Sequence, residues 1–141
     1  MNEKEQRIFD PIRRQYVKAT PEEVVRQHII NYLTNHKGAP QGLITVERSL
    51  KLNGLTKRCD ILVCDRNGNP LLLVECKAPE VKITNSAFEQ IARYNLTLRV
   101  PYLVVTNGST TYCCKVDFDT EKIEFLKDIP GYEELSASAV G

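Results

Sequence analysis

The chain has 141 residues and a mass of 16.0 kDa, which is enough for one domain of ordinary size with a single core. Charged residues make up 26% and hydrophobic residues 42%, a balance that argues against a disordered chain. Nineteen Lys and Arg against eighteen Asp and Glu leave a formal charge of +1, which excludes a uniformly basic, nucleic-acid-coating protein.

Membrane and secretory signals are missing from the amino-acid pattern. The longest aliphatic run, residues 71–74, is far too short to span a bilayer, and the charged start has no apolar signal-peptide core. We therefore expect a cytoplasmic protein without a membrane partner. The five cysteines lack the paired spacing of a zinc site, and most lie in apolar strand-like runs, so we expect reduced thiols that pack in the core.

The first elements in chain order are a charged leader and a helix. Residues 1–19 carry a few apolar anchors and should pack on the domain as a leader. Thr20 is a good N-cap, Pro21 suits the first helical position, and Glu23 completes the pattern of a capping box. The helix should run from there to about Asn35.

Strands dominate the rest of the chain. We predict strands over 44–52, 58–64, 71–77, 102–106, 111–117 and 121–126, and a second helix over 84–99. The Asn67-Gly68 pair is a strong hairpin signal between the second and third strands. A helix between the third and fourth strands indicates a crossover, so the fold class is α/β: a single domain over 20–126 with a central mixed sheet flanked by helices. Residues 127–141 have little to bury and should form a flexible tail.

Two carboxylates and a lysine should meet on this sheet. Residues two apart in a strand share a face, so Glu75 and Lys77 project together. Pairing across the hairpin turn would bring Asp60 close to Glu75. Mg²⁺ binds through one or two carboxylates and keeps several waters, so Asp60 and Glu75 would suffice as ligands, and the carbonyl of Cys76 could add another oxygen.

Such a site is suited to phosphodiester hydrolysis. A bound Mg²⁺ polarises a phosphate oxygen and lowers the pKa of an attacking water, and Lys77 could position that water or stabilise the developing charge. A cross-strand surface salt bridge is the alternative explanation of these three residues. We favour the metal site because apolar residues flank Asp60 and Glu75, and charges inside buried strands are usually paired or bind metal.

Two helical residues could complete the site. Glu22 lies one turn before Val25, the centre of the apolar stripe, and should face the sheet, whereas Glu23 should point away and serve the capping box. The choice between Glu22 and Glu23 stays open, since both could lie in solvent at the helix start. In the second helix Gln90 shares a face with Tyr94 and could orient a phosphate or the Lys77 amine, or could be an ordinary surface residue.

These residues resemble a known family. The arrangement of Glu22, Asp60, Glu75-Cys76-Lys77 and Gln90 is similar to that of the PD-(D/E)XK nuclease superfamily, whose fold is restriction-endonuclease-like. More narrowly, six short motifs in order resemble the N-terminal nuclease domain of type I restriction enzyme R subunits; they lie at 9–14, 20–27, 57–61, 73–79, 90–95 and 106–108.

The resemblance implies a DNA endonuclease core that depends on Mg²⁺, with Mn²⁺ as a possible substitute. Asp60 and Glu75 would hold the metal, Lys77 would be catalytic, and Glu22 and Gln90 would complete the site. Arg58 and Lys82 flank this site and are the two candidates for DNA contact.

The chain departs from full R subunits in one respect. None of its seven glycines is followed by Lys, so the phosphate loop of an ATP-driven motor is missing. We expect separate motor or specificity subunits as partners, or a small protein that acts alone and could pair as a homodimer. The alternative function is a catalytically silent nuclease-fold module that binds DNA or a restriction-system partner.

Overall fold

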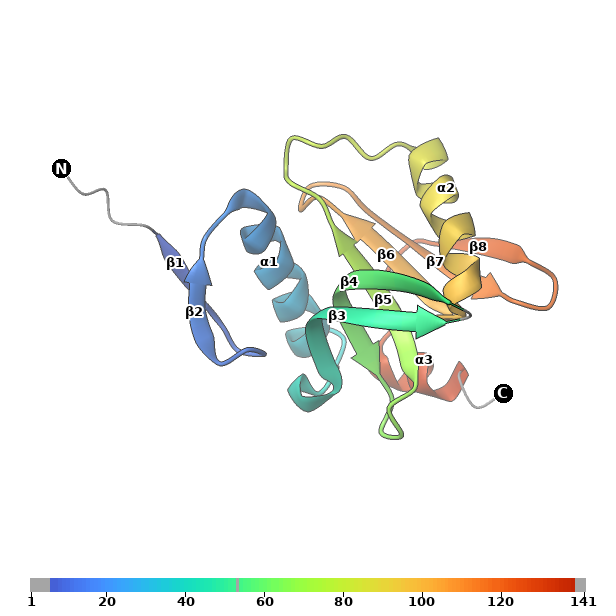
Figure 1. The fold of residues 1–141 in the computed structure, drawn as a ribbon, viewed down its shortest axis with the longest axis horizontal. Helices are drawn as coiled ribbons and strands as arrows, with labels where there is room; N and C mark the ends of the chain where they lie inside the picture. The colour runs from blue at the N-terminus through green and yellow to red at the C-terminus, as the bar shows by residue number, and fades with distance from the viewer. Residues whose placement is uncertain (1–5, 53, 139–141) are drawn as a thin grey trace.

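The computed structural model describes residues 6–52 and 54–138 of the chain (Figure 1). Its helices are α1 (Pro21–Asn35), α2 (Asn85–Asn95) and α3 (Tyr132–Ser138), with short 3-10 turns η1 (Gln41–Leu43) and η2 (Leu96–Leu98). Its strands are β1 (Arg7–Asp10), β2 (Gln15–Lys18), β3 (Ile44–Leu52), β4 (Leu55–Cys64), β5 (Pro70–Cys76), β6 (Tyr102–Thr106), β7 (Thr111–Asp117) and β8 (Lys122–Leu126).

One mixed sheet organises the domain. Its strand order is β3-β4-β5-β6-β7-β8, and each neighbouring pair is antiparallel except β5 and β6, which run parallel. The parallel pair needs a crossover connection, and α2 lies in it. Gly68 has a φ of +85°, the left-handed conformation that the Asn67-Gly68 turn requires. The α/β fold class and the central mixed sheet predicted from the sequence are therefore confirmed.

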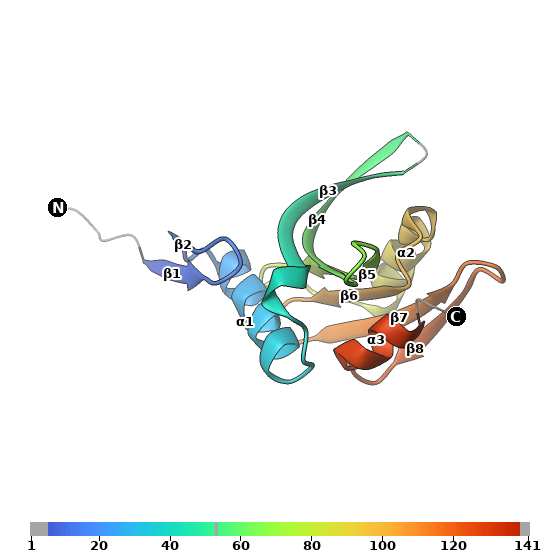
Figure 2. The same ribbon diagram turned by 90° about the horizontal axis from the view of Figure 1, so that it is seen from below.

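Helices cover both faces of the sheet, and each face has its own core. On one face α1 and α3 contribute Val25, Ile30, Leu33, Tyr132 and Leu135 to a buried cluster with the sheet. On the other face α2 contributes Phe88 and Ala92. Figure 2 shows these layers edge-on, with α2 on one side of β5 and β6 and α1 and α3 on the other. The five cysteines are all buried, as predicted for core residues.

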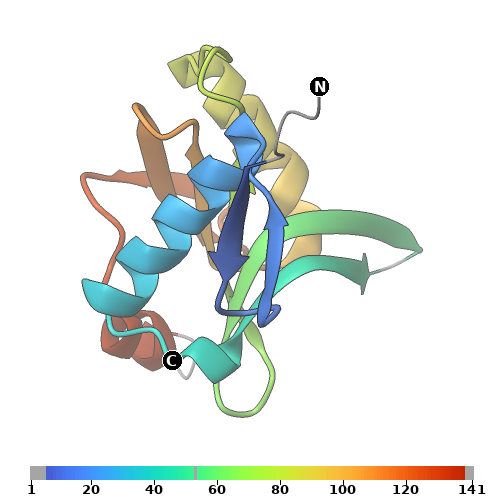
Figure 3. The same cartoon turned by 90° about the vertical axis from the view of Figure 1, so that its left-hand side faces the viewer.

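The N-terminal leader forms a hairpin. Strands β1 and β2 pair antiparallel, with Phe9 opposite Tyr16, and the hairpin lies against α1 (Figure 3). Ile12 in its turn packs on the α1-side core, and Asp10 is fully buried. The leader is therefore attached to the domain by both apolar and polar contacts.

The C-terminal stretch corrects the sequence prediction of a flexible tail. Residues 132–138 form α3, and Ile129, Tyr132 and Leu135 are at most 2% exposed. The Tyr132 hydroxyl donates to the carbonyl of Cys64 at 3.2 Å, and its backbone N–H donates to Lys37 O at 2.7 Å. Tyr132 and Leu135 are three apart in α3, and Ile129 lies in the segment just before the helix, so the helix and its approach together place all three in the α1-side core. Within the part of the chain that the structure describes, no helix is long and apolar enough to cross a membrane.

Candidate functional site

The antiparallel register of β4 and β5 places Asp60 beside the Glu75-Cys76-Lys77 segment. Ile61 lies opposite Val74, and Asp60 and Glu75 are the residues that flank this pair on the same side, one on each strand. The backbone N–H of Cys76 donates to Oδ2 of Asp60 at 2.7 Å. The sequence prediction that the hairpin brings Asp60 to this segment is thus correct in geometry.

Glu75 lies on the opposite face of the sheet from Val74 and Cys76, whose side chains belong to the α1-side core. Glu75 is 8% exposed, which is unusual for a carboxylate at the end of a strand. Lys77, two residues after Glu75, is half-buried, and its backbone N–H donates to Thr106 O at 2.8 Å. This bond extends the β5–β6 pairing beyond Cys76 and fixes the backbone from which the Lys77 side chain leaves.

The Cys76 thiol lies on the α1 face of the sheet, within the electrostatic influence of Asp60. Its burial, together with the negative charge of Asp60, raises the pKa of Cys76 to about 12. At neutral pH the sulfur is therefore a protonated thiol and not the thiolate that soft metals bind. Among the described residues no group of three or more His, Cys, Asp and Glu side chains is placed to hold a metal ion. The donors available here are carboxylate and carbonyl oxygens, which suit a hard cation that keeps its waters.

Arg26 is a member of the site that the sequence analysis missed. Although it is only 6% exposed, it reaches three carboxylates. Its Nη2 lies 3.4 Å from Oδ1 of Asp60, and its Nη1 lies 2.7 Å from Oε1 of Glu23 and 3.6 Å from Oε1 of Glu47. The sequence did contain a signal for this role: Arg26 lies at helical spacing among the apolar residues of α1. A guanidinium buried there needs anionic partners.

The orientation predicted for Glu23 is wrong. Its backbone N–H donates to Thr20 Oγ1 at 3.1 Å, as a capping residue should, but its carboxylate is buried and accepts from Arg13, Arg26 and Gln27 at 2.8, 2.7 and 3.1 Å. The two guanidinium groups draw the side chain inward. Thr20 N–H instead donates to Lys18 O at 2.9 Å, so the second half of the capping box is not formed.

Glu22 is exposed at the start of α1 and is not buried against the sheet. Its negative charge nevertheless contributes to the raised pKa of the Cys76 thiol, after burial and Asp60. Of the two neighbouring carboxylates, Glu23 is the buried one and Glu22 is the one exposed to solvent. The catalytic role of Glu22 stays a prediction.

The remaining candidates are dispersed around this centre. Gln90 is exposed on α2, and the side chain of Tyr94 lies outside the described residues. Lys82 is exposed in the loop that joins β5 to α2. Arg58 is exposed, and its Nη2 lies 3.2 Å from Oε2 of Glu47. The structure therefore brings the Asp60 carboxylate to the backbone of Cys76, between Glu75 and Lys77, and the roles of all these residues stay predictions.

The loop after Lys77 is held by the turn between β6 and β7. The amide Nδ2 of Asn107 donates to Val81 O at 2.8 Å, and its Oδ1 accepts from the N–H groups of Ser109 and Thr110 at 2.9 and 2.7 Å. Asn107 is buried, and Gly108 beside it has a φ of +95°. The sequence predicts a turn at this pair, but its contact with a loop 26 residues earlier could not be predicted.

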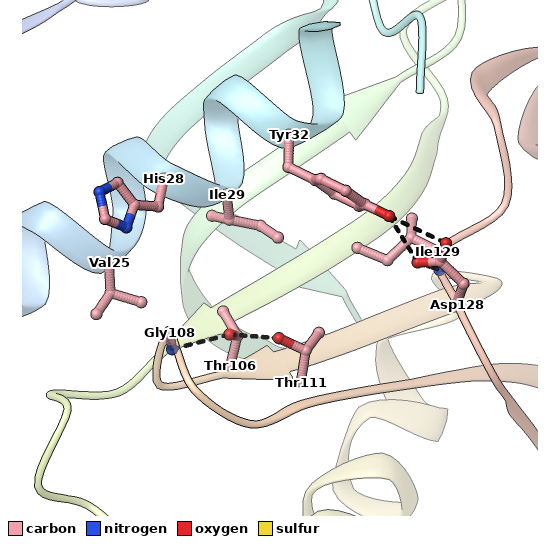
Figure 4. A pocket seen from close by; sticks show the side chains of 9 residues that line it. All are labelled: Val25, His28, Ile29, Tyr32, Thr106, Gly108, Thr111, Asp128 and Ile129. Atoms are coloured by element: carbon pink, nitrogen blue, oxygen red, sulfur yellow. Dashed lines mark hydrogen bonds between the residues drawn. The ribbon is translucent and has the colours of Figure 1, made fainter. Parts of the chain in front are cut away.

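A hollow of about 300 Å³ lies between α1 and the end of β6 and β7 (Figure 4). Val25 and Ile29 supply an apolar wall. The Tyr32 hydroxyl donates to the Asp128 carboxylate at 2.9 Å, and the hydroxyls of Thr106 and Thr111 are 2.8 Å apart. The exposed His28 of α1 lines the same hollow.

Comparisons with known proteins bear on the family and the fold of this chain. Residues 21–130 match the family model of the type I restriction enzyme R protein N terminus. A fragment from Vibrio vulnificus YJ016, assigned as an HsdR subunit of a type I restriction enzyme, is similar in structure, with a TM-score of 0.61 and 20% identity over 86% of this chain and 26% of that one. A protein from Anabaena variabilis ATCC 29413, assigned as a nuclease of the DUF820 group, has a TM-score of 0.52 and 11% identity over 87% of this chain and 80% of that one.

At these identities the two solved structures establish the fold alone, and this chain spans about a quarter of the Vibrio chain. No curated protein matches the sequence. The family match, in contrast, covers most of the chain, including both carboxylate strands, the lysine and α1. The chain therefore belongs to the family of type I restriction enzyme R protein N-terminal domains.

Proposed function

We propose that this chain is a metal-dependent DNA endonuclease domain of the restriction type, which hydrolyses phosphodiester bonds without a motor of its own. The observation that carries the proposal is the 2.7 Å hydrogen bond from the Cys76 N–H to Asp60, which joins the two carboxylate strands at the Glu75-Cys76-Lys77 segment. Family membership and the nuclease assignment of one structural neighbour support the same reading.

Asp60 and Glu75, with the carbonyl of Cys76, would hold Mg²⁺, and Mn²⁺ could replace it. The donor set fits such an ion because it consists of oxygens, the neighbouring Cys76 thiol stays neutral, and the Glu75 carboxyl group is buried. When bound, a divalent cation would polarise a phosphate oxygen and lower the pKa of a water molecule.

The protein's own side chains would supply the rest of the chemistry. Lys77, anchored by its backbone bond to Thr106, would orient the attacking water or stabilise the charge that builds on the phosphate. Glu22, exposed at the start of α1, would bind or deprotonate water at the mouth of the site. Gln90 would orient a phosphate from α2, and Arg58 and Lys82 would contact the DNA backbone.

The partners follow from the family. An R protein N-terminal domain belongs to a type I restriction system, so we propose that separate motor and specificity subunits act together with this domain on DNA in the cytoplasm. Two copies acting as a homodimer would provide the two active sites that cleavage of both strands needs. The +1 net charge gives little general attraction to DNA, so partner subunits would deliver it.

Calorimetry with Mn²⁺ tests the metal site. The wild type should show saturable binding that is lost in Asp60→Asn/Glu75→Gln, because both substitutions remove charge with little change in shape. Glu89→Gln is the matched control, since Glu89 is an exposed carboxylate on α2 that pairs with Arg93. Equal binding by the wild type and the double variant would refute the assignment of the two ligands.

Cleavage of plasmid DNA tests the catalytic role of Lys77. Lys77→Ala should lower the rate about 100-fold or more, the usual effect of losing a charge-stabilising group, while the folded state persists. Lys115→Ala is the control, because Lys115 is an exposed lysine opposite Tyr102 at the other end of β6. Full activity in Lys77→Ala would rule out this mechanism.

The alternative, a catalytically silent module that binds DNA or a restriction-system partner, is supported by one observation. Arg26 already balances the charge of Asp60 at 3.4 Å, as a structural ion pair would. If the wild type neither binds Mn²⁺ nor cuts DNA, yet still retards a DNA duplex or a partner subunit, this alternative replaces the nuclease.

A further inference from the structure

A single buried cation contacts one of the two proposed metal ligands. The guanidinium of Arg26 is 7% exposed and reaches Asp60 with Nη2 and both Glu23 and Glu47 with Nη1. Its Nε is buried and has no hydrogen-bond partner among the described residues, so the group is held by its two terminal nitrogens alone. Those two nitrogens determine where the guanidinium lies and, through Nη2, which way Asp60 turns.

From this arrangement we propose that Arg26 is a positioning residue of the nuclease site. It holds the Asp60 carboxylate in the orientation for ligation and limits the affinity of the site for divalent cations. The inference rests on the proposed function, because it assigns Asp60 the role of metal ligand. One oxygen of Asp60 is fixed by the Cys76 N–H at 2.7 Å and the other faces Arg26 at 3.4 Å, so these two contacts define its side-chain torsion.

Arg26 is itself held by Glu23 of α1, which is in turn paired with Arg13 of the N-terminal hairpin. Glu23 Oε1 accepts from Arg26 Nη1 at 2.7 Å and from Arg13 Nη2 at 2.8 Å. Arg13 in turn bonds through Nε to Asp10, the fully buried carboxylate of β1. An unbroken series of ion pairs therefore runs from the hairpin to the proposed metal ligand: Asp10, Arg13, Glu23, Arg26 and Asp60.

The positive charge and the shape of Arg26 make separable contributions. The charge repels a divalent cation bound to Asp60, so its removal should tighten cation binding. The planar fork bridges Glu23 and Asp60, so its loss should leave Asp60 less well oriented and slow the reaction. General damage to the fold would instead weaken metal binding and slow cleavage together. Opposite changes in these two quantities are therefore the signature of a positioning residue.

The test is plasmid cleavage by the full chain as a function of Mn²⁺ concentration, from which each variant yields a half-saturating concentration and a maximal rate. Arg26→Met removes the charge at similar length, Arg26→Lys keeps the charge without the fork, and Arg93→Met is the control for an exposed arginine that pairs with Glu89. Thermal unfolding followed by circular dichroism verifies that each variant is folded.

For Arg26→Met we expect the half-saturating Mn²⁺ concentration to fall about tenfold or more, because the charge repulsion that is lost is about this large even at the dielectric constant of bulk water, about 80. Its maximal rate should fall at least about tenfold, because small misplacement of a ligand is costly in rate. Arg26→Lys should keep the Mn²⁺ requirement within about twofold of wild type but share the slower rate. Arg93→Met should match the wild type.

Three outcomes would overturn the proposal, and they are distinguishable. If Arg26→Met, or Arg26→Lys when the Met variant does not fold, cuts at the wild-type rate, Arg26 has no positioning role while the nuclease assignment stands. If Arg26→Met needs more Mn²⁺ and is also slower, its role is general stability. If the wild type cuts at no Mn²⁺ concentration, the proposed function falls, and the positioning role falls with it.

Discussion

The two neighbouring glutamates at the start of α1 allow a sharp test of the buried ion-pair network. Glu23 is 7% exposed and its carboxylate accepts hydrogen bonds from two arginines and a glutamine, whereas Glu22 is exposed. We predict that Glu23→Ala is strongly destabilising and that Glu22→Ala is close to neutral. The two changes remove the same side chain from adjacent positions of one helical turn, so each controls for helix propensity in the other.

The magnitude follows from what each substitution leaves behind. Breaking one partner of a buried ion pair typically destabilises by 3–5 kcal/mol, because a buried charge is left without compensation. Here Arg26 would retain Glu47 at 3.6 Å and Asp60 at 3.4 Å, and Arg13 would retain Asp10. We therefore expect the lower end, about 3 kcal/mol for Glu23→Ala. Glu22→Ala should stay within about 0.5 kcal/mol of wild type, as surface substitutions usually do.

Urea unfolding followed by circular dichroism measures both free energies, and thermal unfolding should show a Tm lower by about 10 °C for Glu23→Ala. The slope of the free energy of unfolding against urea concentration should be the same in all three proteins, which verifies that the unfolded states are comparable. If Glu23→Ala and Glu22→Ala unfold at the same urea concentration, the Glu23 carboxylate does not hold the two arginines. The series of ion pairs from the hairpin to Asp60 would then be refuted.

Two further predictions concern pH. Burial of the Asp10 carboxyl raises its pKa, but hydrogen bonds and charge from Arg13 outweigh this and hold the pKa below 3.8, so Asp10 adds stability at neutral pH that is lost as the pH falls through that lowered pKa. Asp10→Asn should thus have a lower free energy of unfolding in urea than wild type at pH 7. If the difference between the two free energies does not narrow below about pH 4, the lowered pKa of Asp10 is contradicted. Burial raises the pKa of Cys76, Cys113 and Cys114 to about 12, so these thiols should react with Ellman's reagent at pH 8 only after denaturant is added. The stability they contribute should decline as the pH rises from about 9 toward 12, and rapid labelling of the folded protein would contradict their burial.

Much of the fold was predictable because its signals are local. The cap at Thr20, the turn at Asn67-Gly68 and the apolar run of β5 each depend on a few adjacent residues, and each is confirmed. The position of Asp60 beside Glu75 follows from the same hairpin, since a tight turn determines the register of its two strands. The roles of the outer residues in catalysis and DNA binding are matters of chemistry that neither the pattern nor the fold decides.

What could not be predicted depends on contacts between distant segments. Helical spacing alone places Glu22 toward the sheet, but the burial of Glu23 requires Arg13, which the hairpin brings from ten residues earlier in the chain. The packing of α3 depends likewise on the carbonyl of Cys64, 68 residues before Tyr132. The C-terminal stretch has few apolar side chains of its own. It becomes ordered because those few fit into a core that other segments of the chain form.

The position of α3 along the chain has a consequence for synthesis. A ribosome adds about 5–20 residues per second, and the nascent chain can fold only from what has emerged. Because Ile129, Tyr132 and Leu135 complete the α1-side core, that layer stays open until residue 135 has left the exit tunnel, although α1 and all six strands of the sheet are made earlier. During that interval the apolar side of β5 and β6 is uncovered in part, and a chaperone that binds exposed aliphatic strands would find its target there.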